Sequence, residues 1–184
     1  MGQTQKPAKA DELFFVVDEN DQPLNPLPRK FVHGHGVWHR VAHLCIVNEQ
    51  RWVLCHQRSL DVELSPGAWA MCLGGHNNPG ESYEQAAIRE LKEEVGIDIE
   101  SASRPWKIHK FSGPGSNNEF QAIFIIKWGG RISDLHFSDN EVSQAVWKEV
   151  PAIRKGLAVG ESWATCGYEQ DLLNAIETQS WRAA

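Results

Sequence analysis

The carboxylates in the segment RELKEEVG, residues 89–96, have an arrangement that helix stability alone does not explain. Glu90, Glu93 and Glu94 crowd the last turns of a predicted helix that ends at Gly96. The C-terminal end of a helix carries partial negative charge, which disfavours anions there. Glu90 and Glu94 are also a like-charge pair at i,i+4, which costs a few tenths of a kcal/mol. The cluster therefore predicts that a positive charge absent from the sequence binds here.

The predicted helix has two different faces. A turn of about 100° per residue gathers the three glutamates within roughly a third of the circumference. Ile88, Leu91 and Val95 form a separate apolar stripe, which is expected to pack on a sheet. Clusters of oxygen ligands suit Mg²⁺ or Mn²⁺, which also bind substrate phosphates. The alternative is a solvated acidic face, the usual meaning of a charge run.

The elements that must position this helix are mostly strands. Ser82 and Gln85 have the spacing of a capping box, which predicts the start of the helix. Alternating or apolar runs predict strands within residues 13–25, 41–47, 51–59, 70–75, 106–113, 120–128 and 144–150, and an amphipathic pattern predicts a C-terminal helix at about 168–182. The segment FVHGHGVWHR, residues 31–40, is expected to be a connection. The order of elements predicts a mixed α/β fold without regular βαβ alternation.

Length and composition bound the class of protein. The 184 residues and 41% hydrophobic content suit one domain at 12–184 after a flexible leader at 1–11. The cysteines form no C-x-x-C pair, so free thiols in a reducing compartment are expected. No signal peptide and no run of roughly 20 apolar residues is found, which predicts a cytoplasmic protein with no membrane partner. The net charge of −6 disfavours nucleic acid as a partner.

The segment from Gly75 to Ile97, GHNNPGESYEQAAIRELKEEVGI, resembles the Nudix signature G-x5-E-x7-R-E-U-x-E-E-x-G-U, where U is a bulky aliphatic residue. Every defined position is filled, by Gly75, Glu81, Arg89, Glu90, Leu91, Glu93, Glu94, Gly96 and Ile97. The resemblance implies the Nudix fold of the α/β class, an α/β/α sandwich around a mixed sheet with a catalytic loop–helix–loop. The family core would span residues 39–151.

The same resemblance implies a role for each matched residue. The metal ligands would be Glu90, Glu93 and Glu94, with the carbonyl of Gly75 as a further ligand. Glu90 is alternatively, or additionally, the base that activates water. Arg89 and Glu81 resemble the pair that orients the catalytic helix, since a guanidinium can hold carboxylates in a fixed fork. The cofactor implied is Mg²⁺ or Mn²⁺.

Glu141, in the segment SDNEVSQAVW, resembles a downstream acidic residue that many Nudix enzymes add as a ligand or base. The alternative is a solvated loop carboxylate. The implied activity is divalent-metal-dependent hydrolysis of a diphosphate linked to another moiety, with nucleoside di- and triphosphates as first candidates. The implied partner is a small phosphorylated substrate, and a homodimer is an alternative to a monomer.

The pattern QRS…SPGAW…GGH resembles the isopentenyl-diphosphate-isomerase-like branch of the family. The isomerase has a cysteine immediately before the glycine of its Gly-His pair, but Gly74 holds that position here. Cys72 lies two residues earlier, on the same side of a strand. Glycine offers no proton, so the hydrolase is favoured. An isomerase-type enzyme and a catalytically silent binding domain remain the alternatives.

Histidines are the other candidate ligands. The isomerase holds a metal with histidines from comparable regions, and His76 matches one of them directly. His76, His43 and His39 are expected either to contribute to a second metal site or to contact the substrate, which for His76 would mean its phosphates. In the alternative, the strand histidines are simply hydrogen-bonded, and His33 and His35 are ordinary loop residues.

Overall fold

The computed structural model of the chain describes residues 12–62, 64–113, 117–137 and 141–180. The predicted leader and the last two residues of the predicted C-terminal helix lie outside these ranges. In chain order the elements are β1 (Leu13–Phe14), β2 (Leu27–Pro28), α1 (Arg29–His35), β3 (His39–Val47), β4 (Val53–Arg58), β5 (Trp69–Ala70), β6 (Leu73–His76), α2 (Tyr83–Val95), β7 (Lys107–Gly113), β8 (Asn117–Lys127), the 3-10 helix η3 (Ile132–Asp134), β9 (Val142–Lys148), α3 (Val150–Ala158) and α4 (Glu169–Thr178).

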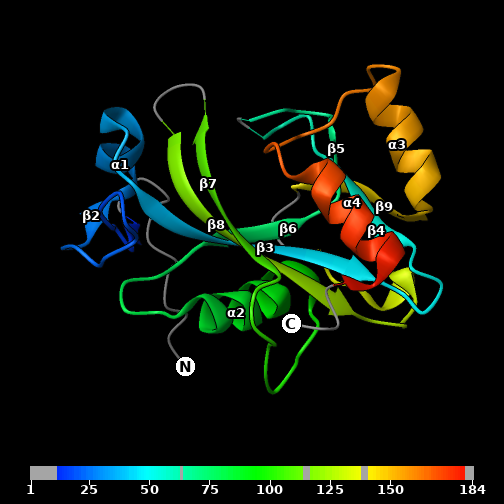
Figure 1. Ribbon diagram of the computed structural model, residues 1–184, viewed down its shortest axis with the longest axis horizontal. Coiled ribbons are helices and arrows are strands. Elements are labelled where there is room, and N and C mark those ends of the chain that lie inside the picture. Colours follow the sequence, from blue (N-terminus) through cyan, green and yellow to red (C-terminus); the bar gives the residue numbers. More distant parts are fainter. Residues whose placement is uncertain (1–11, 63, 114–116, 138–140, 181–184) are drawn as a thin grey trace.

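A mixed sheet forms the centre of the described part of the molecule (Figure 1). Its strand order is β5-β4-β3-β8-β7, while β6 pairs with β3 and β9 pairs with β4. The pair β3 and β8 is parallel, and the pairs around it are antiparallel. The α/β class and the mixed sheet predicted from the sequence are confirmed.

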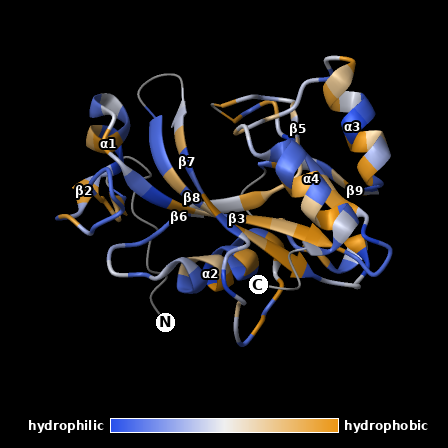
Figure 2. Cartoon of the chain, viewed as in Figure 1, coloured by the Kyte–Doolittle hydropathy of each residue, from blue (hydrophilic) through white to orange (hydrophobic). Residues whose placement is uncertain are grey.

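Helices cover both faces of this sheet, as an α/β/α sandwich requires (Figure 1). The apolar stripe of α2, with Leu91 and Val95, packs in one core with Leu44 of β3 and Phe124 of β8. Because neighbouring residues of a strand point to opposite faces, Cys45 belongs to the other core. Figure 2 shows hydrophobic residues gathered on the central strands and on the side of α2 that meets the sheet.

The second core lies under α3 and α4. Its fully buried side chains from these helices are Ile153, Leu172, Leu173 and Ile176. Burial of a side chain of this size stabilises the fold by about 1.5–3 kcal/mol. Helix α3 was not predicted, although Pro151 in its first turn and the apolar spacing of its residues are signals of a helix start.

Two predictions about the strands need correction. The residues 70–75 do not form one strand, because β5 pairs with β4 whereas β6 pairs with β3. The predicted hairpin of β3 and β4 exists, but its strands pair only at Val47 and Val53 and then diverge. This divergence opens the sheet between β6 and β4, where residues of both strands line a cavity.

The segment 31–40, predicted as a connection, contains most of a short helix. Helix α1 ends at Gly36, which has the left-handed φ of 65° that glycine tolerates. Together with β1 and β2, this helix covers one end of the sheet (Figure 1). Phe14 and Val32 form its small core. Among the described helices, none has the length and apolar character to cross a membrane.

Candidate active site

Helix α2 begins and ends where the sequence predicts. The Ser82 side chain accepts a hydrogen bond from the Gln85 backbone N–H, and the Gln85 side chain accepts one from the Ser82 N–H, at 3.2 and 2.8 Å. At the other end, Gly96 adopts a left-handed φ of 74° and its N–H donates to the Lys92 carbonyl. These two caps fix the register of the helix, and therefore the directions in which its glutamates point.

Arg89 connects the helix to the loop before it. Its Nε and Nη2 donate to the two carboxylate oxygens of Glu81 at 2.8 and 2.9 Å, in a bidentate pair. Nη1 donates to Glu90 at 2.6 Å and to Glu93 at 3.3 Å, and Nη2 also reaches the His76 carbonyl at 2.9 Å. One guanidinium thus holds three carboxylates and the end of β6 together.

Glu81 is held from both sides. Burial alone raises the pKa of its carboxyl, but the hydrogen bonds and charge of Arg89 and the hydrogen bonds from Asn78 outweigh burial and leave the pKa lowered. The Asn78 backbone N–H donates to this carboxylate at 2.8 Å. Glu81 therefore stays ionised and holds the Arg89 guanidinium through both of its carboxylate oxygens.

Glu90 lies beside the backbone of β6. A Cβ atom at Gly75 would sit only 2.5 Å from Glu90 Oε1, so a glycine lets this carboxylate approach the strand. Burial raises the pKa of Glu90, and the neighbouring Glu93 and Glu81 carboxylates add to the rise against the opposing charge of Arg89. A buried carboxylate among other carboxylates is a suitable site for a cation, since the cation removes their mutual repulsion.

The three clustered glutamates differ in exposure. Glu90 is buried, whereas the side chain of Glu93 is about half exposed. Glu94 lines a cavity of about 190 Å³ together with Glu141, the downstream acidic residue. The fold thus brings Glu141 to the same cavity as the end of α2, across 47 positions of sequence (141 − 94).

This cavity passes through the opening in the sheet between β6 and β4. Glu94 comes from α2 on one face, whereas Tyr168 and Glu169 belong to the start of α4 on the other face. The strand residues His56 and Arg58 line it between these ends. Sequence reasoning did not select these four additional residues. Arg58 stands in the QRS pattern but was given no role there, and His56, Tyr168 and Glu169 stand in no motif.

His56 is the most unusual of the residues that sequence reasoning missed. It is 4% exposed, and its Nδ1 is buried without a hydrogen-bond partner. Burial, and to a lesser degree the charge of Arg58, lowers its pKa to about 4. A buried polar atom without a protein partner beside a cavity is suited to a bound water or ligand.

We expect His56 to make the metal-free protein less stable at acidic pH. Its pKa of about 4 lies below the ordinary value of 6.5, so the unfolded chain takes up the proton first. Stability present above pH 6.5 is then lost as the pH falls toward 4, by about 2 kcal/mol for this residue between pH 7 and pH 5. Urea unfolding in EDTA at both pH values measures the loss.

Two single variants are compared with the wild type in that measurement. His56→Gln removes the buried histidine, and His35→Gln is the control because His35 is an exposed histidine. The free energy of unfolding of His56→Gln should fall about 2 kcal/mol less than that of the wild type over this range. The His35→Gln protein should follow the wild type. Equal losses in all three proteins would show that His56 titrates normally.

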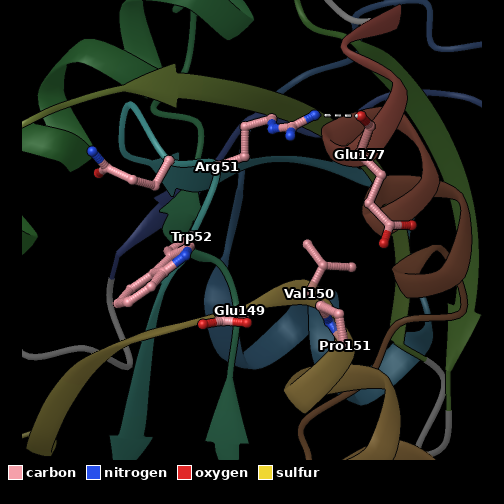
Figure 3. Close-up of a pocket in the computed structure, with 7 residues that line it drawn as sticks. Arg51, Trp52, Glu149, Val150, Pro151 and Glu177 are labelled. Atoms are coloured by element: carbon pink, nitrogen blue, oxygen red, sulfur yellow. Dashed lines mark hydrogen bonds between the residues drawn. The ribbon is translucent and has the colours of Figure 1, made fainter.

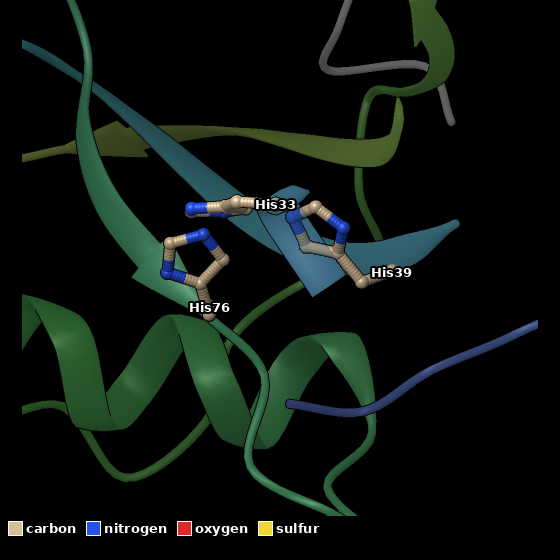
Figure 4. Close-up of side chains that lie close together, drawn as sticks. All are labelled: His33, His39 and His76. Atoms are coloured by element: carbon tan, nitrogen blue, oxygen red, sulfur yellow. The ribbon is translucent and has the colours of Figure 1, made fainter. Parts of the chain in front are cut away.

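Three other histidines meet on the α4 side of the sheet, next to helix α1. His33 of α1, His39 of β3 and His76 of β6 place ligand atoms within 4.8 Å of one another (Figure 4). Nε2 of His39 is buried without a hydrogen-bond partner and lies 3.7 Å from a carboxylate oxygen of Glu119. Burial, followed by the neighbouring His39, lowers the pKa of His76 well below its ordinary value, so its ring is neutral.

This group differs from the histidine set predicted from the sequence. His39 and His76 belong to it, but His43 does not, and its place is taken by His33, which the alternative interpretation treated as a loop residue. His33 reaches the group because α1 folds over the end of the sheet. His43 instead lines the cavity and contacts Tyr168. Its predicted role as a substrate contact therefore stays open.

A larger surface hollow, of about 330 Å³, lies away from these residues (Figure 3). Trp52, Val150 and Pro151 line it, and Arg51 donates a hydrogen bond to the Glu177 carbonyl at its rim. No residue of the Nudix-like segment is among its described lining residues. We therefore place the candidate site at the smaller cavity, which Glu94 and Glu141 line, with Glu90 and Glu93 outside its described lining residues.

Comparisons with known proteins show the family of the chain. Residues 37–163 match the NUDIX domain family. An uncharacterized Nudix hydrolase of Pseudomonas aeruginosa is 32% identical over 167 residues, which cover 90% of this chain and 91% of that protein. An isopentenyl-diphosphate Delta-isomerase of Klebsiella pneumoniae is 27% identical over 157 residues, covering 84% and 85%.

Solved structures extend the comparison to the fold. The crystal structure of DR0079 from Deinococcus radiodurans has a TM-score of 0.71 at 24% identity, and the match covers 90% of this chain and 99% of that one. The Escherichia coli dihydroneopterin triphosphate pyrophosphohydrolase has a TM-score of 0.55 at 24% identity, covering 79% and 96%. At these identities the likeness establishes the fold.

Proposed function

The chain belongs to the Nudix family of pyrophosphohydrolases, and we propose that it hydrolyses a diphosphate linkage with a divalent cation held by the α2 glutamates. The proposed ligands are Glu90, Glu93 and Glu94, with the carbonyl of Gly75 beside them. These are hard oxygen donors, so Mg²⁺ or Mn²⁺ is the expected cation.

One observation carries this proposal. The Arg89 guanidinium holds Glu81, Glu90 and Glu93 at hydrogen-bond distance, while Glu94 faces the cavity that Glu141 also lines. A helix face that was merely solvated would not need a buried carboxylate against a glycine backbone or a bidentate arginine to orient it. Supports of this kind are typical of metal ligands, whose directions must be fixed.

The bound cation would neutralise phosphoryl oxygens and lower the pKa of a bound water. The protein itself would orient the ligands, accept a proton and bind the substrate. Arg89 and Glu81 fix the helix, and Glu90 or Glu141 is the proposed base that accepts the proton of the attacking water. Arg58, also in the cavity, is a suitable partner for a phosphate oxygen of the substrate.

The proposed substrate is a diphosphate linked to another moiety, and nucleoside di- and triphosphates are the first compounds to test. The test measures release of phosphate and monophosphate from a panel of such compounds, with Mg²⁺ and with EDTA. Turnover that requires Mg²⁺ would support the proposal and identify the substrate class. No release from any compound by the folded protein would contradict it.

An isomerase is the second candidate, because a relative that is 27% identical carries that name. Isomerisation requires an acid–base residue at position 74, but the backbone around Gly74 leaves no room for a side chain. Gly74 has a φ of 142°, and a Cβ atom there would lie 1.9 Å from the Ala42 carbonyl oxygen. That distance is far inside van der Waals contact, so the two strands would have to separate.

We therefore expect Gly74→Cys to fold poorly rather than to become an isomerase. The clash and the backbone conformation together should lower the free energy of unfolding by about 3 kcal/mol. Urea unfolding tests this, with Gly129→Cys as control because a Cβ at Gly129 meets no atom within 4 Å. Deuterium incorporation into isopentenyl diphosphate by a stable Gly74→Cys protein would contradict the expectation.

The group of His33, His39 and His76 supports a second proposed cation site. Imidazole nitrogens with a nearby carboxylate, here Glu119, suit transition metals better than Mg²⁺. Co²⁺ titration followed by visible absorption separates the two sites. The bands of nitrogen-ligated Co²⁺ should be lost in His39→Gln and kept in Glu94→Gln, and unchanged bands in His39→Gln would exclude the histidine site.

A further inference from the structure

The end of the cavity farthest from Glu94 of α2 contains a hydrogen-bonded pair of side chains. Tyr168, which precedes α4, is 3% exposed, and its hydroxyl lies 2.7 Å from Nδ1 of His43 on β3. The two residues are 125 positions apart in the sequence. Both residues line the cavity.

Neighbouring groups hold this pair in place. The Glu169 carboxylate accepts hydrogen bonds from the backbone N–H groups of Cys166 and Gly167, which fixes the turn that carries Tyr168. The ring of His109 meets the Tyr168 ring edge-on at 5.7 Å, and its Nε2 is hydrogen-bonded to the Cys166 carbonyl at 3.1 Å. A rigidly oriented hydroxyl is what selective recognition of a ligand group requires.

The pair is polar without being charged. Burial lowers the pKa of His43, although Glu119 and Glu169 oppose this, so its imidazole is neutral. Burial and the nearby Cys72 raise the pKa of Tyr168, so its hydroxyl keeps its proton. In the tautomer whose Nδ1 carries no proton, His43 accepts the tyrosine O–H. Lone pairs on the Tyr168 oxygen can then accept a further hydrogen bond.

The two ends of the cavity are chemically different. Glu94, Glu141 and Arg58 make the end near α2 charged, which suits a cation and phosphates. The far end contains the pair with Met71 and Cys72 beside it, and its one carboxylate, Glu169, already accepts hydrogen bonds from the backbone N–H groups of Cys166 and Gly167. Its volume of about 190 Å³ lies below the 300–1,000 Å³ typical of sites for drug-sized ligands, so a compact group fits better than a nucleoside.

We propose that the His43–Tyr168 pair determines specificity by binding a compact, uncharged, hydroxyl-bearing group attached to the diphosphate. This inference rests on the proposed function for the orientation of the substrate, with its phosphates at α2. The substrate hydroxyl donates to the Tyr168 oxygen. A substrate without that hydroxyl leaves the buried tyrosine oxygen with an unused lone pair. It binds more weakly, because the tyrosine oxygen has lost its contact with water and gains no hydrogen bond in return.

The experiment compares two ligands that differ in one hydroxyl, butyl diphosphate and 3-hydroxybutyl diphosphate. Methylene-bridged forms of both, which cannot be hydrolysed between the phosphorus atoms, allow binding to be measured by calorimetry with Mg²⁺. The wild type should bind the hydroxylated form at least about tenfold more tightly. Tyr168→Phe should bind both forms equally, with its affinity for the plain form unchanged.

Tyr83→Phe is the matched control, because Tyr83 also donates its hydroxyl to a protein group, Asp21, but does not line the cavity. It should keep the wild-type preference. His43→Gln is a second variant, and it should reduce the preference by leaving the tyrosine hydroxyl less firmly oriented. A preference that survives in Tyr168→Phe, or equal binding of both ligands by the wild type, would overturn the inference.

Hydrolysis of the natural diphosphate forms separates this inference from the proposed function. With Mg²⁺, KM for 3-hydroxybutyl diphosphate should rise about tenfold in Tyr168→Phe while kcat changes little, since the hydroxyl lies away from the reacting phosphorus. Absence of hydrolysis by the wild type would contradict the proposed function alone. The binding preference would still decide whether the pair recognises a hydroxyl group.

Discussion

Glu94→Gln is expected to lower kcat for Mg²⁺-dependent diphosphate hydrolysis by roughly a thousandfold. The substitution keeps the shape of the side chain but removes the negative charge that faces the cavity. An amide oxygen is a weaker ligand for a divalent cation than a carboxylate, and an amide cannot accept a proton at neutral pH. Steady-state release of phosphate, measured over a range of Mg²⁺ concentrations, gives both kcat and the apparent metal affinity.

Glu84→Gln is the control for this measurement. Glu84 lies in the first turn of the same helix, outside the carboxylate cluster, so its loss changes the charge of α2 by the same amount. It should cost only a few tenths of a kcal/mol through the helix dipole and leave kcat near the wild-type value. A Glu94→Gln protein as active as Glu84→Gln would remove Glu94 from the proposed catalytic site.

Gly75→Ala is expected to reduce kcat about a hundredfold with little loss of stability. The added methyl would lie 2.5 Å from Glu90 Oε1, so the carboxylate must move by about 1 Å to reach van der Waals contact. Because the clash is with the end of a flexible side chain, the helix and strand can stay in place. The displaced Glu90 would no longer meet a cation and Arg89 in the same geometry.

Both kcat and the free energy of unfolding in urea are measured for Gly75→Ala, because kcat should fall while the free energy of unfolding changes little. Gly129→Ala is the control, since a Cβ at Gly129 meets no atom within 4 Å. It should change neither kcat nor the free energy of unfolding by more than a small amount. If Gly75→Ala kept full activity, the close approach of Glu90 to β6 would have no part in catalysis. A large loss of stability would instead mean that the strand shifted.

The thermal stability of the protein with and without a cation is a second test of cation binding by the α2 glutamates. Glu81, Glu90 and Glu93 share one arginine, so negative charge exceeds positive charge around Arg89. A divalent cation that binds only the folded protein stabilises it by mass action. This stabilisation should be smaller in Glu94→Gln, which makes thermal unfolding with and without Mg²⁺ a useful companion to the kinetics.

The sequence by itself determined helix α2 and the kind of chemistry that its glutamates suit. The capping box at Ser82, the stop at Gly96 and the spacing of Glu90, Glu93 and Glu94 are local properties, set within a few turns of one helix. Arg89 and Glu81 are also close in sequence, and the structure shows their bidentate contact. Motif and helix geometry were therefore enough to select these residues and to indicate the Nudix fold.

Tertiary structure alone decided which distant residues share the cavity. His43 and Tyr168 meet only because α4 packs on the face of the sheet that carries His43, and His56 faces the cavity only because β4 diverges from β3. The exchange of His43 for His33 in the histidine group has the same origin, since α1 folds back over β3. Such contacts depend on the packing of elements far apart in the chain, and no local pattern encodes them.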